Sequence, residues 1–293
     1  MGGTGTASTA GTSVSSTATW PRRGQSPRGR GRRQHALLRL RGDIPFGARV
    51  GIAVFSVVAL IGLWWLAADV LVNKTFFANP TDTLRGFRDL WESGDLAADV
   101  QASGLRIVKG YSISMAVGIT LGVAIGSFRS AEALWESPIG FLRYIPATAL
   151  TPLFLVAFGI DDAPKVALIV AGTVFFNVVM IADVARAVPR EMVDTAYTLG
   201  AGRVRVLGRV IMPHCWPGII DVGRINLAAA WPLLVVAELF AGTDGLGYRV
   251  TVLKRYSEWD QMFAVLLVFA LIGLVSDLFL RWLRNRVSPW ARP

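Results

Sequence analysis

The chain has 293 residues, of which 53% are hydrophobic and only 17% are charged. Soluble domains carry about 25% charged residues, so this composition argues against a soluble globular protein and favours a membrane protein. The net charge of +10 is concentrated in residues 1–49, which hold nine arginines against one aspartate. A basic tail beside an apolar run is more typical of a lipid-facing segment than of a nucleic-acid arm, and we expect no nucleic-acid partner.

We expect residues 1–49 to form a disordered, basic cytoplasmic tail, because residues 1–31 cannot bury enough apolar surface to fold. The apolar run that follows starts near residue 50, is too long for a cleaved signal peptide and lacks a small-residue cleavage site. Cys215 is the only cysteine, which excludes an intrachain disulfide framework and a cysteine-cluster metal site.

Six stretches are long and apolar enough to cross a membrane, since a membrane helix needs about 20 mostly apolar residues. They are residues 50–72, 110–128, 139–160, 166–182, 218–241 and 262–283. We therefore expect an all-α, polytopic membrane protein whose six-span domain covers residues 50–285. Residues 286–293 would form a short cytoplasmic C-terminal tail.

The positions of lysine and arginine set the expected orientation, because cytoplasmic segments carry an excess of both. With the N-terminus inside, the tail, residues 129–138, residues 183–217 and the segment from Arg281 onward hold 19 basic residues. The segments on the other side, 73–104, 161–165 and 243–260, hold seven. We expect a protein of the cell membrane with both termini in the cytoplasm.

The external segment 73–104 has apolar residues at helical spacing, namely Leu84, Phe87, Leu90 and Trp91. This spacing predicts a short amphipathic helix that lies on the membrane surface. A plain loop with one helical turn is the alternative.

Signatures of enzymes are missing from the sequence. No lysine follows a glycine, so the phosphate-binding loop G-x-x-x-x-G-K-[ST] is absent and we do not expect this chain to hydrolyse a nucleotide. His35 and His214 are far apart and have no metal-ligand spacing. An integral membrane enzyme stays open as an alternative, but no convergent catalytic set supports it.

The cytoplasmic segment 183–217 predicts a pair of helices. Pro189 suits a first helical turn, and Gly200 suits the left-handed residue that ends such a helix. A second amphipathic helix would follow, with Val206 and Ile211 on its apolar face and Arg203 outside it. We expect Pro213 to end this second helix.

This segment resembles the motif E-A-A-x3-G-x9-I-x-L-P of bacterial ABC-importer permeases. The chain has Asp194-Thr195-Ala196, Gly200 six residues after Asp194, and Val210-Ile211-Met212-Pro213. Ala196, Gly200 and Pro213 match the family residue, and the other positions are conservative changes. The resemblance implies that the residues Asp194, Thr195, Ala196, Gly200, Arg203, Val210, Met212 and Pro213 belong to a coupling loop that docks into a cytoplasmic ATPase.

Two further stretches are similar to the nitrate/sulfonate/taurine-type subfamily. Arg143-Tyr144-Ile145-Pro146 with Thr151-Pro152-Leu153 resembles that group's R-P-I-P…P-L, and Ala237-Glu238 with Gly245-Leu246-Gly247-Tyr248 resembles its A-E…G-L-G-Y. Tyr144 departs from the pattern, where proline is common.

Membership implies a type I ABC-importer permease fold and a dimer of permeases in the lipid membrane. It also implies two ATPase subunits, which carry the ATP and Mg, and an extracytoplasmic substrate-binding protein. The substrate would be a small anion such as an alkanesulfonate, taurine or nitrate. Bicarbonate and vitamin precursors are alternatives within the class, and an ion-gradient-driven carrier is an alternative outside it.

Broken helices mark transporter pathways, because freed backbone groups are tolerated only where they face protein or water. Pro146 and Pro152 in the third span and Pro232 in the fifth predict such breaks. The candidate pathway residues are Arg143, Pro146, Thr148, Thr151, Pro152, Arg224, Asn226 and Glu238.

Several of these polar residues have a simpler alternative reading. Arg224 can pair with Asp221 three residues away, and Glu238 can accept hydrogen bonds from the glycine-rich turn that follows it. Arg143 can extend to the cytoplasmic interface. Asn177 in the fourth span is more typical of a hydrogen bond between helices than of a ligand.

Overall fold

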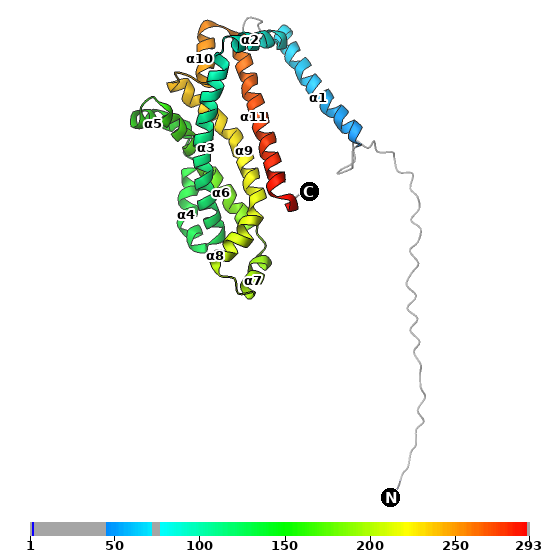
Figure 1. Ribbon diagram of the computed structural model, residues 1–293, viewed down its shortest axis with the longest axis vertical. Helices are drawn as coiled ribbons and strands as arrows, with labels where there is room; N and C mark the ends of the chain where they lie inside the picture. The colour runs from blue at the N-terminus through cyan, green and yellow to red at the C-terminus, as the bar shows by residue number, and fades with distance from the viewer. Residues whose placement is uncertain (1, 3–44, 72–76, 292–293) are drawn as a thin grey trace. The chain divides into compact units, whose positions relative to one another are not determined.

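The computed structural model describes Gly2 and residues 45–71 and 77–291. The predictions of disorder and cytoplasmic location for the N-terminal tail fall on residues that lie almost entirely outside these ranges. The chain divides into two compact units, residues 1–58 and 59–293. Every regular element of the described residues is helical, which confirms the all-α prediction (Figure 1).

Helix α1, Phe46–Leu66, continues as the π-helical segment η2, Ala67–Leu71. It begins four residues before the predicted span, and the carbonyl of Pro45 accepts the Arg49 N–H in its first turn. In the second unit, Trp64 stacks on Phe263 and donates its indole N–H to the Ala78 carbonyl at 3.1 Å.

The other predicted spans also correspond to helices. Four are continuous and long enough to cross a membrane: α3, Asp95–Ser127; α6, Asp162–Arg186; α9, Met212–Ala241; and α11, Trp259–Val287. With α1 these make five candidate spans, or six when the bent pair formed by α4 and α5 counts as one. Helix α3 starts 15 residues before the predicted span, because polar residues in its first turns are buried against other helices rather than exposed to lipid.

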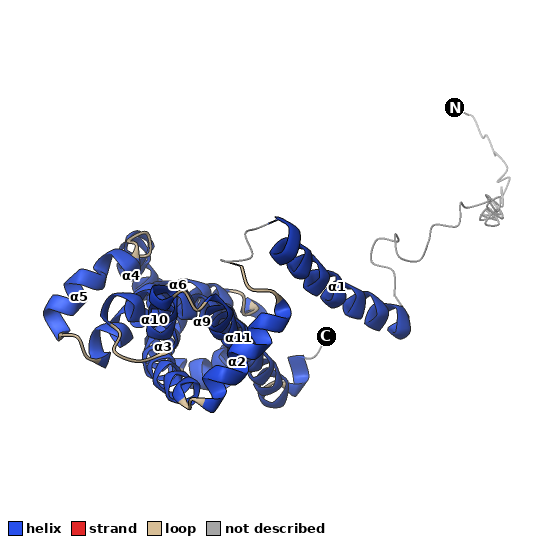
Figure 2. Cartoon of the chain, turned by 90° about the horizontal axis from the view of Figure 1, so that it is seen from above, coloured by secondary structure: helices blue, strands red, loops and turns tan. Residues whose placement is uncertain are grey.

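The third predicted span is broken. Helix α4, Arg129–Leu142, is followed by the 3-10 turn η3, Ala147–Leu150, and by α5, Thr151–Phe158, and the two parts meet at 78°. Seen from above in Figure 2, α4 and α5 lie on the opposite side of the bundle from α11 and α2.

Only one of the three predicted proline breaks is correct. The chain bends at Pro146, which directly precedes η3. Pro152 instead lies in the first turn of α5, where no N–H is needed for a helical hydrogen bond. Pro232 lies inside α9, which continues through it at the cost of one backbone hydrogen bond.

Helix α2, Pro80–Glu92, confirms the predicted amphipathic helix, and its location on a membrane surface stays a prediction. Asn79 caps it by accepting the Asp82 N–H at 2.9 Å. Leu90 is buried in the core, whereas Leu84 and Trp91 are about two-thirds exposed. In Figure 1, α2 lies across the start of α11.

The core forms where α3 packs along α6, and glycines on α3 allow this close approach. A Cβ added at Gly118 would lie 2.7 Å from the Asn177 Cβ, one at Gly122 2.7 Å from the Val178 carbonyl oxygen, and one at Gly126 2.5 Å from the Ala182 carbonyl oxygen. Small residues four apart on one helix face are typical of tight helix contacts in membranes. Helix α9 packs on both α6 and α3.

The segment after α6 forms the predicted helix pair, with one correction. Helix α7, Arg190–Thr198, ends at Gly200, whose φ of 78° is left-handed as predicted. Helix α8, Arg203–Val206, then runs through the π-helical segment η4, Leu207–Ile211, directly into α9. Pro213 therefore does not end the second helix. It lies in the first turn of α9, just after the wider π turn, which accommodates a residue that has no N–H.

The helix α10, Leu246–Tyr256, lies beside the start of α11 at the end of the bundle opposite α7 and α8 (Figure 1). The 3-10 turn η5, Pro289–Ala291, completes the described chain. We refer below to the α7 end and the α10 end of the bundle.

Candidate functional site

The α7 end carries the segment that the sequence identified as a coupling loop. The turn after α7 is closed by backbone hydrogen bonds: the N–H of Gly200 donates to the Tyr197 carbonyl at 2.9 Å, and that of Ala201 to the Ala196 carbonyl at 3.0 Å. The Thr195 hydroxyl donates to the Glu191 carbonyl at 2.6 Å. The turn thus has one defined shape, which depends on the left-handed Gly200.

One face of this segment packs on the bundle. Val206 is buried, and Val193, Leu207 and Ile211 pack against a core cluster that contains Ile181 and Cys215. Of the predicted motif residues, Ala196, Val210, Met212 and Pro213 are half-buried. This packing fixes α7 and α8 to the ends of α6 and α9.

The other face of the segment is exposed. It presents the polar side chains of Asp194, Thr195 and Arg203, together with large apolar residues: Met192, Tyr197, Leu199 and Val204 are 43%, 46%, 82% and 85% exposed. Exposed apolar side chains mark an interaction site where they are grouped on a protein surface, and these four lie within one segment of 13 residues. These four apolar residues were not predicted to be exposed. Both faces of the short helix pair are partly apolar, so the sequence alone does not show which face packs against the bundle.

A second candidate site lies at the break of the third span. A cavity of about 250 Å³ is lined there by residues of the break, by Gly172 and Phe175 of α6 and by Leu233 of α9. Three predicted pathway residues line it, namely Arg143, Pro146 and Thr148. Arg143 is the one charged side chain among the described residues that line this cavity. Its guanidinium donates to the Tyr144 hydroxyl at 3.1 Å.

The other predicted pathway residues lie elsewhere. The buried Thr151 donates its hydroxyl to the Thr148 carbonyl at 2.8 Å, and Pro152 is exposed on α5. Arg224 forms ion pairs with Asp221 at 2.9 Å and with Asp277 of α11 at 2.6 Å. The alternative reading of Arg224 as half of a local pair is therefore confirmed and extended to α11.

Asn226 belongs to a buried series of side-chain hydrogen bonds that links three helices. Its amide donates to the Asn177 side-chain oxygen at 2.7 Å, and the Asn177 amide donates to the Ser114 hydroxyl at 2.9 Å. The Thr173 hydroxyl lies 2.7 Å from the same Ser114 oxygen. The prediction that Asn177 bonds between helices is confirmed.

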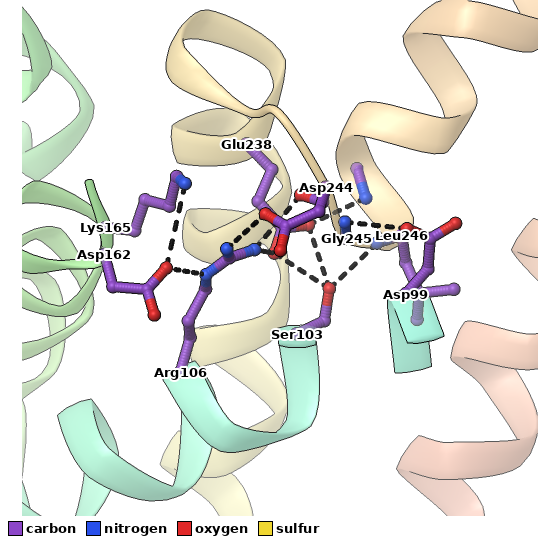
Figure 3. A network of polar contacts seen from close by, with 10 residues as sticks. Asp99, Ser103, Arg106, Asp162, Lys165, Glu238, Asp244, Gly245 and Leu246 are labelled. Carbon is purple, nitrogen blue, oxygen red and sulfur yellow. Dashed lines mark hydrogen bonds and ion pairs between the residues drawn. The ribbon is translucent and has the colours of Figure 1, made fainter. Parts of the chain in front are cut away.

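Glu238 lies in a network of charges at the α10 end, which Figure 3 shows. Its side chain is fully buried. Arg106 of α3 donates to it at 2.7 Å, and the Ser103 hydroxyl donates at 2.8 Å. Arg106 also donates to Asp162 of α6 at 2.7 Å and to the Asp244 carboxylate. One guanidinium thus connects α3, α6, α9 and the turn before α10.

The same network caps α10. The backbone N–H groups of Gly245 and Leu246 donate to Asp99 and Ser103 at 2.8 and 2.9 Å (Figure 3). The N–H of Gly247 donates to Glu238 at 2.8 Å. Carboxylates at a helix N-terminus are stabilised by the free N–H groups and the helix dipole. The alternative reading of Glu238 as an acceptor for the glycine-rich turn is confirmed.

Arg249 ties α10 itself to α3. It donates to Asp99 at 2.6 Å and to Asp95 at 3.0 Å. Burial lowers the pKa of Arg249, but the hydrogen bond to Asp99 and the negative charges of Asp99 and Asp95 outweigh it and hold that pKa above its ordinary value. Arg249 therefore stays charged at any physiological pH.

The comparisons with known proteins point to one family. The model of the binding-protein-dependent transport system inner membrane component matches residues 115–289. A probable ABC transporter permease of Brucella melitensis is 32% identical over 82% of this chain and 97% of its own length.

The chain belongs to this family of ABC-importer permeases.

Several relatives are named for a substrate, among them taurine, aliphatic sulfonates and bicarbonate. The taurine transport permease TauC of Escherichia coli is 31% identical over 86% of this chain and 94% of its own length. A putative aliphatic sulfonates permease, SsuC of Bacillus subtilis, is 29% identical over 79% of this chain and 84% of its own. Among solved structures, an importer of the acidic polysaccharide alginate has a chain that matches with a TM-score of 0.59, at 14% identity, over 83% of this chain and 94% of that one. The last likeness shows that the fold is that of ABC-importer permeases.

Most of the charged network of this permease was not predicted from the sequence. The first turns of α3 contain Asp99, Ser103 and Arg106, and the first turn of α6 contains Asp162 and Lys165. Charged residues at the edges of apolar runs are usual in membrane proteins, so nothing marked these as buried. One usable signal was that Arg106 stands only four residues before the predicted start of a span.

No group of His, Cys, Asp or Glu side chains in the described ranges has the arrangement of a metal site. Lys165 is 2% exposed and has Asp162, at 3.8 Å, as its ion-pair partner. The charges of the network are therefore compensated by protein groups.

Proposed function

We propose that this permease forms, with a second copy, the membrane pathway of an ATP-driven importer for small organic anions, with taurine and other alkanesulfonates as the leading class. The observation that carries the proposal is the cavity at the break of the third span, where Arg143 is the charged residue among apolar and aromatic ones. An oxyanion forms charge-assisted hydrogen bonds with a guanidinium. The broken helix beside it is typical of transporter pathways.

The lining of the cavity favours an anion that also has a carbon chain. Phe175, Phe176 and Leu233 face the same space as Arg143, and apolar walls gain from the burial of methylene groups. Nitrate and bicarbonate have no methylene groups to bury there. Relatives named for the transport of taurine or of aliphatic sulfonates support the same choice, whereas one named for bicarbonate transport is 26% identical over 63% of this chain. Family membership argues against an ion-gradient-driven carrier.

We further propose that the α7 end faces the cytoplasm and docks on an ATPase subunit that binds ATP and Mg, as the family motif implies. The exposed residues Met192, Tyr197, Leu199 and Val204 offer the apolar part of this contact, and Asp194 and Arg203 offer the polar part. The α10 end then faces outward, toward a substrate-binding protein. Both termini would lie in the cytoplasm.

In this mechanism ATP binding draws the ATPase subunits together and the docked α7 moves with them. Only a difference in binding free energy between two states can drive such a change. The fixed Gly200 turn and the continuous helix from α8 into α9 allow α7 to transmit its movement to the span that borders the cavity.

The test is uptake of labelled taurine, nitrate and bicarbonate in cells with and without this chain, before and after ATP depletion. Uptake of taurine that depends on the chain and stops on ATP depletion supports the proposal. Uptake of nitrate or bicarbonate alone would keep the importer and overturn the organic-anion choice. Chain-dependent uptake that survives ATP depletion would overturn the ATP-driven mechanism.

A further inference from the structure

A second cavity, of about 510 Å³, runs along the bundle as a groove between α3, α9 and α11. It shares no lining residue with the cavity at Arg143. On α3 its lining extends from Gly104 to Ile119, a length of about 22 Å at the rise of a helix. The whole hydrocarbon core of a bilayer is about 30 Å thick. The groove is therefore long enough to hold the acyl chain of a lipid from one leaflet.

The walls of this groove are apolar. Trp216 and Trp231 line it on α9, Met115 lines it on α3 and Phe279 on α11, and no charged side chain of the described residues lines it. Such walls fit an acyl chain, but they do not distinguish one lipid from another, because lipid tails are as apolar as the side chains themselves. Any preference for a headgroup has to come from residues at the ends of the groove.

Arginines follow the lining of the groove at the α7 end. The lining residues Ile272, Ser276 and Leu280 of α11 stand four apart and so share one helix face. The next residue at this spacing is Arg284, and Arg281 directly follows Leu280 in the chain. The apolar stripe of α11 therefore ends in two guanidinium groups.

Carboxylates hold both of these arginines by one nitrogen only. Arg281 Nε lies 2.9 Å from Asp277, and Arg284 Nε lies 2.9 Å from Asp221. The same two carboxylates pair with Arg224 of α9, so this cluster of three arginines and two aspartates carries one excess positive charge. No residue that the structure describes pairs with the terminal Nη groups of Arg281 or Arg284, whose side chains are 58% and 28% exposed. Both are oriented donors that are available to an anion.

We propose that the groove binds an anionic phospholipid, with an acyl chain along its apolar walls and the phosphate on the Nη groups of Arg281 and Arg284. A guanidinium forms charge-assisted hydrogen bonds with phosphate, and basic pockets between membrane helices bind anionic headgroups. Trp216, which is 36% exposed, lines the groove at this same end, and tryptophan is enriched at the level of the headgroups. The inference goes beyond the proposed transport function and does not depend on which solute is imported.

The test adds phosphatidylglycerol or phosphatidylcholine to the full-length chain in detergent and counts the retained lipids by native mass spectrometry. We expect tighter binding of phosphatidylglycerol. This preference should fall about tenfold or more in R281Q/R284Q, because each basic residue contributes to the attraction of an anionic lipid. R85Q/R88Q is the matched control, since it removes two exposed arginines at the same spacing from α2, at the α10 end. It should keep the preference of the wild type.

Two further variants test the groove and the charge separately. S112W fills the groove from α3 without a change of charge and should weaken the binding of phosphatidylglycerol severalfold. R281K/R284K keeps both charges and should retain most of the preference, which distinguishes a lost charge from a lost fold. Inorganic phosphate at millimolar concentration should not displace the lipid, because it gains nothing from the apolar walls.

The proposal is overturned if R281Q/R284Q prefers phosphatidylglycerol as strongly as R85Q/R88Q does. Displacement of the lipid by inorganic phosphate would also overturn it, since the arginines would then bind a free anion without the groove. If S112W prevents the permease from pairing with a second copy, a protein surface fills the groove in place of a lipid, and the proposal is wrong.

Discussion

Arg106 and Glu238 are 132 residues apart in the chain, yet they form an ion pair of 2.7 Å whose side chains are 4% and 0% exposed. Each charge of a buried pair loses its hydration, so the pair is stable only when its other hydrogen-bonding groups also find partners. Here the remaining hydrogen-bonding groups of both side chains are met by Ser103, Asp162, Asp244 and the N–H of Gly247. The pair joins α3 to α9 and, through its neighbours, to α6 and α10.

The first prediction concerns Arg106. Replacing it with glutamine leaves Glu238 buried without a cation, and removing one partner of a buried pair costs about 3–5 kcal/mol. We expect R106Q to lower the free energy of unfolding in detergent by about that amount. R85Q is the control: Arg85 pairs with Asp82 on the surface, at 77% and 40% exposure, so its loss should cost less than about 1 kcal/mol. Equal effects of R106Q and R85Q would contradict this account of the network.

The second prediction concerns the packing of α3 on α6. Gly122 has no room for a side chain, since an added Cβ lies 2.7 Å from the Val178 carbonyl oxygen and 2.8 Å from the Ile181 Cβ. G122L should separate the two helices and strongly reduce the amount of folded permease in the membrane. Gly104, on the same helix, has no atom within 4 Å of an added Cβ, so G104L should accumulate normally. Fluorescence-detected size-exclusion chromatography distinguishes the two outcomes, and a normal profile for G122L would refute the close contact.

The third prediction concerns the turn after α7. Gly200 has a φ of 78° and nothing within 4 Å of an added Cβ, so a substitution there acts through the backbone alone. A left-handed conformation costs a β-branched residue about 1–2 kcal/mol or more, and G200V should reshape the turn. We expect ATP-dependent uptake to fall severalfold in G200V at unchanged expression. G200N should retain most uptake, because asparagine tolerates this conformation. Full uptake by G200V would count against the coupling role.

The fourth prediction concerns Asp194, which stands where the family motif has glutamate. Its side chain is exposed on α7 and free to contact a partner. D194E should keep the permease bound to its ATPase subunit during purification, whereas D194K should release it, because the charge is reversed at a contact surface. If D194K co-purifies with the ATPase as the wild type does, Asp194 lies outside the docking contact.

The spans and the α7 segment were predictable because their signals are local. An uninterrupted apolar run can be recognised without knowledge of the tertiary structure. The same holds for the spacing of Asp194, Gly200 and Pro213. The ends of the elements were harder: α3 starts 15 residues early since Asp99, Ser103 and Arg106 are satisfied by partners more than 50 residues away. Pro213 and Pro232 were predicted to interrupt helices, but a π turn before one and tertiary packing around the other keep the chain helical.

The candidate site was predictable in part. Pro146 was chosen as a helix break, and Arg143 and Thr148 as polar residues of the same span, and all three do line one cavity. Arg224, Asn226 and Glu238 were chosen because they are polar within a span, and that criterion does not separate residues that face a cavity from residues that bond to another helix. Each of them bonds to a residue that is distant in the sequence: Arg224 to Asp277, Asn226 to Asn177, and Glu238 to Arg106.

The most direct test of the central proposal is the rate of chain-dependent uptake of labelled taurine by R143Q and R143K, each at the membrane level of the wild type. Arg143 is proposed to attract the anion, so R143Q should take up taurine at least about tenfold more slowly, as expected for the loss of one charge-assisted contact. R143K keeps the charge and should retain a larger share of the rate. Wild-type uptake by R143Q would show that the anion does not pass Arg143 and would contradict the proposed pathway.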